Sequence, residues 1–148
     1  MNTISSILFI NEKLKFVLKD KRRVRTWISS VVISEKHTVG NLCYVFCSDR
    51  HLLEMNKFFL NHDYYTDILS FDYSETLANK RKKRIVSGDF LISLDRVKDN
   101  AKNLNLLFDE ELRRVMVHGL LHLLGYSDKS PADKIKMRKK ENTYLSKF

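Results

Sequence analysis

The chain has 148 residues, 43% of them hydrophobic, and its 27 Lys and Arg against 18 Asp and Glu give a formal net charge of +9. This is the size of one ordinary domain with a sizeable core, so we expect a single domain over residues 1–148. No run of about 18 apolar residues occurs, and polar and acidic residues interrupt the N-terminal segment, which argues against a membrane span and a signal peptide. We therefore predict a soluble, cytoplasmic protein. Cys43 and Cys47 are expected to be free thiols, because four strand residues span about 13 Å, beyond disulfide reach.

The apolar pattern alternates between the period of strands and the period of helices, which predicts a single mixed domain rather than a helical bundle or a sandwich. We predict strands over 5–10, 42–47, 66–73 and 85–94, and helices over 17–34, 49–60, 95–106, from about 109 to 124, and over 131–145. Residues 74–84 are predicted to be a basic loop. In the helix over 49–60 we expect Leu52, Leu53, Met55 and Phe59 to be buried.

The helix starts are marked by capping residues. Ser130 followed by Pro131, with Asp133 three residues after the serine, is a clear helix start. Asp109 to Glu111 are predicted to cap the start of the preceding helix.

Positive charge is clustered, since fifteen of the 27 basic residues fall in three short runs. These are Lys19, Lys21, Arg22, Arg23 and Arg25; Lys80, Arg81, Lys82, Lys83 and Arg84; and Lys134, Lys136, Arg138, Lys139 and Lys140. Such runs attract polyanions by counterion release, and RNA or a ribosome is the commonest intracellular target. The alternative is that they are solvated faces that keep the protein soluble.

The stretch from His118 to Asp128 is the strongest functional signal. His118 and His122 are four residues apart, so on a helix they project from one face about 6 Å apart. Gly125 is the residue best able to adopt the left-handed conformation at the helix end, which would turn the chain and carry Asp128 back toward both rings. We predict that His118, His122 and Asp128 bind one divalent cation.

Two other interpretations of this stretch are open. It could be a core helix with two hydrogen-bonded histidines, since its other residues are largely apolar, but two imidazoles one turn apart would each need a partner and one cation satisfies both. Gly119 also favours the metal site over a plain core helix, because a mid-helix glycine indicates that something approaches the backbone closely. A zinc peptidase would have a glutamate as general base directly after the first histidine, and here that position is Gly119.

Three blocks of the sequence resemble the YbeY family of ribosomal RNA maturation endoribonucleases. The first runs through the histidine motif: His118, Gly119, Leu121, His122, Leu123, Gly125 and Tyr126, with Met137 and Glu141 at the expected later spacing. The second is the strand from Thr66 to Phe71, with Asn56 upstream, and the third is the strand from Gly88 to Ser93. The similarity covers most of the chain.

The chain departs from the family pattern at two positions. Asp128 replaces the third metal-binding histidine; its charge should make the bound water less acidic and admit Mn²⁺ or Fe²⁺ beside Zn²⁺. Leu60 stands where the family usually has an arginine that is thought to handle RNA phosphate. Asn61, His62 or a lysine of the basic runs are the candidates to replace it. Ser70 and Asp89 come from the family-like strands, and we assign them no role.

The resemblance implies an α+β fold, with a small four-stranded mixed sheet and about five helices packed around it. It implies a metal-dependent endoribonuclease with one Zn²⁺ per chain that cleaves single-stranded ribosomal RNA near the 3′ end of the small-subunit RNA and acts in ribosome quality control. We expect a metal-bound water as nucleophile and assign no catalytic side chain; the ribosome or its small subunit is the expected partner, and no membrane. The alternative is a ribosome-associated RNA-binding factor with a structural metal, although no fourth Cys or His follows at ligand spacing.

Overall fold

A computed structural model describes residues 5–77 and 83–148. Its elements are β1 (Ser6–Asn11), α1 (Lys21–Ser34), β2 (Thr38–Cys47), α2 (Asp49–Leu60), β3 (Ile68–Asp72), β4 (Glu75–Thr76), β5 (Arg84–Ser93), α3 (Leu94–Leu104), α4 (Phe108–Leu123) and α5 (Pro131–Leu145). Strands and helices thus form a mixed α+β fold, which confirms the predicted class. None of the helices in these residues is both long and apolar enough to cross a bilayer.

The sheet has the strand order β1-β2-β5-β3. β1, β2 and β5 are parallel, whereas β3 runs antiparallel to β5 at the edge. These are the four predicted strands, but the sheet has a fifth. The two residues of β4, which lie in the predicted loop over 74–84, pair with the start of β5. Residues 78–82 of that loop lie outside the described part of the chain.

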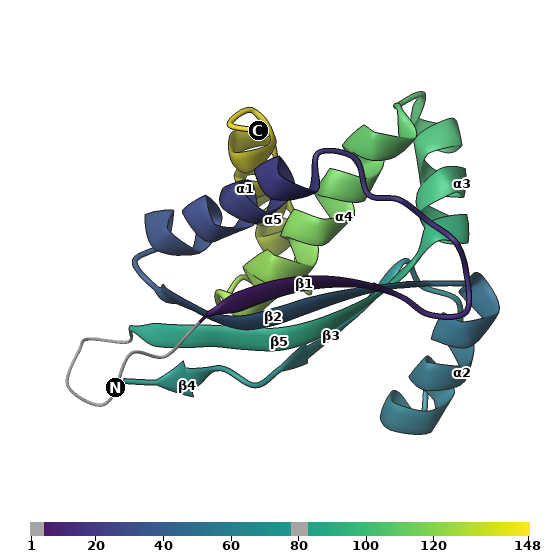
Figure 1. Cartoon of the computed structure of the whole chain (residues 1–148), viewed down its shortest axis with the longest axis horizontal. Coiled ribbons are helices and arrows are strands. Elements are labelled where there is room, and N and C mark those ends of the chain that lie inside the picture. Colours follow the sequence, from purple (N-terminus) through teal and green to yellow (C-terminus); the bar gives the residue numbers. More distant parts are fainter. Residues whose placement is uncertain (1–4, 78–82) are drawn as a thin grey trace.

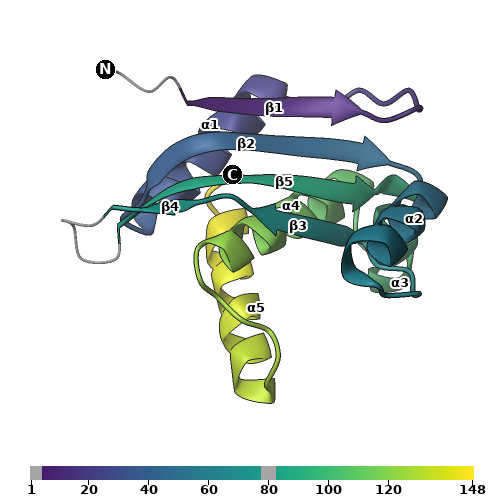
Figure 2. The same ribbon diagram turned by 90° about the horizontal axis from the view of Figure 1, so that it is seen from below.

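The main core lies between one face of the sheet and the helices α1, α4 and α5 (Figures 1 and 2). Strand alternation turns Leu42, Tyr44 and Phe46 of β2 and Phe90 of β5 toward these helices, and all four are buried. α2 lies at the carboxyl ends of β2 and β5, on the other side of the sheet (Figure 1), and packs Leu52 against Cys47 and Leu69. Consequently α4 packs against the sheet, and α3 and α5 contact it along other sides.

Several local predictions were accurate and others were wrong. α2 and α5 have the predicted bounds, and Ser130 caps α5 by accepting a hydrogen bond from the Asp133 amide. α1 begins at Lys21 rather than at 17: residues 17 and 18 are not helical, and Asp20, the N-cap, has a left-handed backbone. α4 is not capped by Asp109 to Glu111: its N-cap is Leu107, which makes no side-chain cap, and the three acids lie inside the first turn. Both cysteines are free thiols, as predicted.

The predicted buried face of α2 was partly wrong. Leu52 is buried, but Phe59 is 56% exposed, and Asn56 is buried in its place. The Asn56 amide group donates to the backbone carbonyl of Tyr64 at 2.9 Å, so it fastens the chain that follows the helix. In the last turn of α2, Phe59 packs only edge-on against Phe71 of β3 and Phe58, which leaves much of its ring exposed.

Candidate metal centre

His118 and His122 lie on the side of α4 that faces away from the buried core. Their side chains are 24% and 32% exposed, whereas Val115, Met116 and Leu120 on the same helix are fully or nearly fully buried. The two rings are therefore at a surface that solvent and a substrate can reach. This differs from a core helix with two enclosed histidines.

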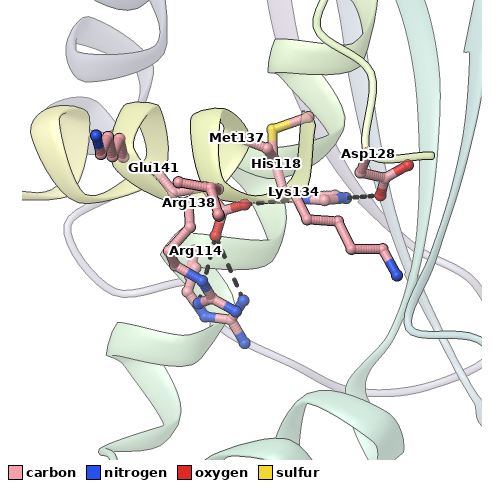
Figure 3. Close-up of a pocket in the computed structure, with 9 residues that line it drawn as sticks. Arg114, His118, Asp128, Lys134, Met137, Arg138 and Glu141 are labelled. Atoms are coloured by element: carbon pink, nitrogen blue, oxygen red, sulfur yellow. Dashed lines mark hydrogen bonds and ion pairs between the residues drawn. The ribbon is translucent and has the colours of Figure 1, made fainter. Parts of the chain in front are cut away.

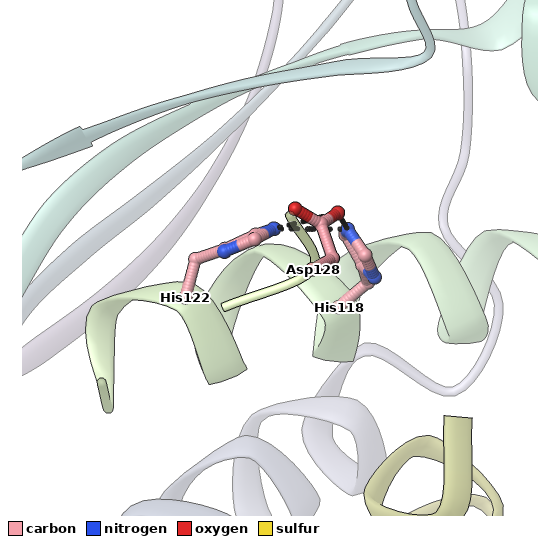
Figure 4. Close-up of side chains that lie close together, drawn as sticks. All are labelled: His118, His122 and Asp128. Atoms are coloured by element: carbon pink, nitrogen blue, oxygen red, sulfur yellow. Dashed lines mark hydrogen bonds and ion pairs between the residues drawn. The ribbon is translucent and has the colours of Figure 1, made fainter. Parts of the chain in front are cut away.

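The end of α4 turns the chain back toward these rings. Gly125 has φ of +103°, its amide donates to the carbonyl of His122 at 3.1 Å, and the Tyr126 amide donates to Leu121 at 3.0 Å. This pair of bonds is the Schellman arrangement, in which a glycine adopts the left-handed backbone and terminates the helix. The predicted turn at Gly125 is confirmed. It brings an Asp128 carboxylate oxygen, Oδ2, to 3.4 Å from Nε2 of both His118 and His122 (Figure 4).

Each ring is held by a hydrogen bond at its other nitrogen. Nδ1 of His118 is 2.8 Å from the Glu141 carboxylate of α5, and Nδ1 of His122 is 3.0 Å from the Tyr126 carbonyl oxygen. Because both partners are acceptors, the proton of the neutral ring is on Nδ1 in each histidine, and a neutral ring presents its Nε2 lone pair. The two Nε2 atoms are 3.0 Å apart and both point toward Asp128 (Figure 4).

This donor set fits a single metal ion. Ligands of a tetrahedral zinc ion with bonds of about 2.0 Å lie about 3.3 Å from one another. The three separations here are 3.0, 3.4 and 3.4 Å. Hydrogen bonds at Nδ1 that fix the orientation of both rings are typical of metal-binding histidines. The cluster can therefore bind a metal ion.

Glu141 is buried and belongs to a charged network behind His118. Its carboxylate also lies 3.4 Å from the Arg114 guanidinium (Figure 3). Arg114 in turn pairs with the buried Glu111. Burial alone would lower the pKa of His118, but the hydrogen bond and charge of Glu141, with Asp128 and Asp67, raise that pKa above its usual 6.5. Burial opposes ionisation of Glu141, yet His118, Arg138 and Arg114 lower the pKa of that carboxyl. Glu141 is thus an anion at neutral pH.

Tyr126 accepts the hydrogen bond of His122 through its backbone carbonyl, and its side-chain hydroxyl makes a second hydrogen bond. Its hydroxyl donates to Glu35 at the end of α1, which also accepts from Tyr144 and from Lys140. Burial opposes the charge on Glu35, but these three donors lower the pKa of its carboxyl. α1 and α5 therefore jointly fix the turn after α4.

Gly119 is explained by packing. A Cβ at this position would lie 2.6 Å from Ile68 and 3.0 Å from Phe90, both on the sheet that α4 covers. The predicted close approach exists, and it comes from the sheet. A glutamate at this position would require the Ile68 and Phe90 side chains to move, and the sequence has glycine where a zinc peptidase has its general base.

The remaining candidates have different positions. Leu60 and Ser70 line a cavity that follows β3 beside the cluster, together with Asp67 and Asp72. Asn61 ends α2 in a left-handed backbone, and His62 stacks on Tyr64. Ser70 pairs with Phe90, whereas Asp89 pairs with Phe71, so Ser70 and Asp89 lie on opposite faces of the sheet. Asp89 points to the sheet face opposite α4, whereas Ser70 faces α4.

The basic runs include residues that make internal contacts. Arg25 donates to the Ile7 carbonyl, Arg84 pairs with Asp72 at 2.8 Å, and Lys140 contacts Glu35. Lys80, Arg81 and Lys82 lie outside the described residues. Part of the clustered charge is thus used by the fold.

Two residues that hold the rings had no assigned role in the sequence. Glu141 lies at the spacing typical of the family and Tyr126 belongs to the histidine motif, but neither pattern indicates a contact with a ring. No local signal identifies either one, because Glu141 is 23 residues from His118 and Tyr126 acts through its backbone.

Comparison with known proteins identifies the family. A model of the family "Endoribonuclease YbeY" matches residues 9–148. Similar proteins of that name include one from Cytophaga hutchinsonii, 46% identical over 95% of this chain and 94% of its own length, and one from Flavobacterium psychrophilum, 43% identical over 96% of each. A Thermotoga maritima protein solved in solution has a similar fold, with a TM-score of 0.62 and 23% identity over 95% of this chain and 87% of its own. The chain therefore belongs to the Endoribonuclease YbeY family.

Proposed function

We propose that His118, His122 and Asp128 bind the metal ion with which this member of the endoribonuclease family cleaves single-stranded ribosomal RNA. The observation that carries the proposal is the convergence of both Nε2 atoms and one Asp128 oxygen within 3.4 Å of one another. We infer zinc, because two imidazoles and a carboxylate are a known zinc donor set, with Mn²⁺ or Fe²⁺ as alternatives that the carboxylate favours.

The residues around the cluster have separable tasks in this reaction. Glu141 and the Tyr126 carbonyl hold the Nδ1 protons and keep both Nε2 lone pairs directed at one point. When bound, a divalent ion supplies Lewis acidity and lowers the pKa of a water molecule, which suits hydrolysis of a phosphodiester. Three protein donors leave a position for water or substrate, as in catalytic rather than structural sites. Ser70 and Asp67 line a cavity that adjoins the cluster along β3.

Family membership and charge support the substrate class. The relatives are named endoribonucleases, and a net charge of +9 favours RNA as a partner. We infer that the whole of residues 1–148 forms one nuclease domain, that it acts in the cytoplasm on ribosomal RNA, and that its site of action is the ribosome or its small subunit.

Metal analysis combined with a cleavage assay tests this function. The purified protein should contain about one equivalent of metal and should cut single-stranded ribosomal RNA in a reaction that a chelator stops. His122→Ala should lose both metal and cleavage, whereas the matched control His51→Ala, on α2, should keep both. A His122→Ala protein that retains one equivalent of metal would contradict the site.

The same experiment separates catalysis from a structural metal. A ribosome-associated factor with a structural ion would bind RNA without cutting it, and chelation would unfold it instead. Melting curves with and without chelator, recorded on the protein used for the cleavage assay, distinguish the two. Cleavage that continues after complete metal removal would refute both versions.

A further inference from the structure

Two cavities meet at the metal cluster, and their charges are opposite. One lies between α4 and α5, has a volume of about 470 Å³, and is lined by His118, Asp128, Arg114, Lys134 and Arg138 among others (Figure 3). The other follows β3 and contains Asp67 and Asp72, of which Asp72 is paired with Arg84, with Leu60 at its border. No Lys or Arg lines this second cavity within residues 5–77 and 83–148. A phosphate next to the cluster is therefore favoured on the α5 side.

The three cations nearest the charged network differ in how far they are already neutralised. Arg114 is bound to Glu111 and Glu141, and only 15% of its side chain is exposed. Arg138 lies 3.6 Å from Glu141. Lys134 is exposed and has no carboxylate within ion-pair distance in the part of the chain that the structure describes. Of these three cations it is the one whose charge is available to a ligand; Lys139 lines the same cavity and is also exposed.

The helix places Lys134 beside the metal ligands. Lys134 precedes Glu141 by seven residues, which is two helical turns, so both lie on the face of α5 that borders the cavity. Because Glu141 holds His118, this face is anchored to the cluster. Figure 3 shows the Lys134 side chain extending past His118 toward the side of the cavity where Asp128 lies.

We propose that Lys134 binds, from the α5 side, the RNA phosphate that lies at the metal cluster. This inference rests on the proposed ribonuclease function. Leu60 borders the acidic cavity and has no charge with which to bind a phosphate. Lys134 borders the basic cavity on the other side of the same two ligands, so a phosphate between His118 and Asp128 would be reached from α5 instead. An ammonium on a flexible stem suits this task, because it neutralises a phosphate without fixed geometry.

The test compares Lys134→Gln with Lys98→Gln, which removes the same charge from an exposed position on α3. Affinity for a single-stranded RNA oligonucleotide is measured at several salt concentrations, along with metal content and the separate values of kcat and KM. Loss of one phosphate contact should reduce the slope of log affinity against log salt by about 0.7 in Lys134→Gln. RNA affinity should fall about fivefold in low salt, with unchanged metal content, and Lys134→Arg should restore both values. Lys98→Gln should match the wild type.

Each other outcome overturns the inference. If the salt slope of Lys134→Gln equals that of the wild type, Lys134 does not contact phosphate. If Lys134→Gln loses metal, the lysine supports Asp128 and has a structural role. The proposed function fails separately: a wild-type protein without chelator-sensitive cleavage refutes the nuclease assignment, whereas its RNA-binding slope still reports on Lys134.

Discussion

His118 and His122 are the same residue type on the same face of one helix, but they are held in different ways. A buried carboxylate from α5 holds His118, and that carboxylate is itself supported by Arg114. A backbone carbonyl in the turn after α4 holds His122. One histidine therefore depends on side-chain charge and the other on main-chain conformation. Changes in side-chain charge should act mainly through His118, and changes in backbone preference mainly through His122.

Among changes outside the three proposed metal ligands, the largest effect should come from Glu141→Gln. The amide keeps nearly the same volume but removes the negative charge that fixes the Nδ1 proton of His118. Metal affinity should fall about 10- to 100-fold, as is typical when a residue that orients a metal-binding histidine is changed. Titration with zinc in the presence of a competing chelator measures this. Glu110→Gln, which removes an exposed acid from the first turn of α4, is the control, and equal affinities for the two variants would contradict the role of Glu141.

The pH dependence should separate the metal-free and metal-bound forms. The folded-state pKa of His118 lies above its usual 6.5, so in the metal-free protein its stabilising contribution is complete below about pH 6.5 and is lost as pH rises through that raised pKa. Metal needs the neutral ring, so metal affinity should instead rise with pH over the same range, by up to about tenfold per unit below the pKa. Unfolding curves and zinc titrations between about pH 5 and 9 measure both trends.

The variant Glu141→Gln tests whether His118 is the group that controls this pH dependence. Without the carboxylate, the pKa of His118 should move down, and both pH profiles should move to lower pH with it. Profiles that stay in place would show that another group controls the titration.

The smallest effect should come from Gly125→Ala. An added Cβ meets no atom within 4 Å, so the cost is that of the backbone at φ +103° alone. We expect about 1 kcal/mol of lost stability and a Tm lower by about 3 °C. Metal affinity should fall less than in Glu141→Gln. Gly125→Asn is the matched comparison, because asparagine tolerates a left-handed backbone better, and a larger loss in Asn than in Ala would contradict this explanation.

Local interactions explain which features were predictable from the sequence. The spacing of His118 and His122, the turn at Gly125 and the cap at Ser130 each depend on residues a few positions apart, and each is present in the structure. The convergence of Asp128 on both rings follows from the same turn. Its role as a metal ligand remains a prediction.

Only the tertiary structure decided the rest, because it depends on contacts between residues distant in the chain. Packing of α5 on α4 brings Glu141 to His118 and places Lys134 at the basic cavity. Strand register turns Ser70 toward α4 and Asp89 away from it. The exposure of Phe59 likewise depends on where α2 ends relative to the sheet. The sequence determined the donors of the candidate metal site, and long-range packing determined how they are oriented and which charges surround them.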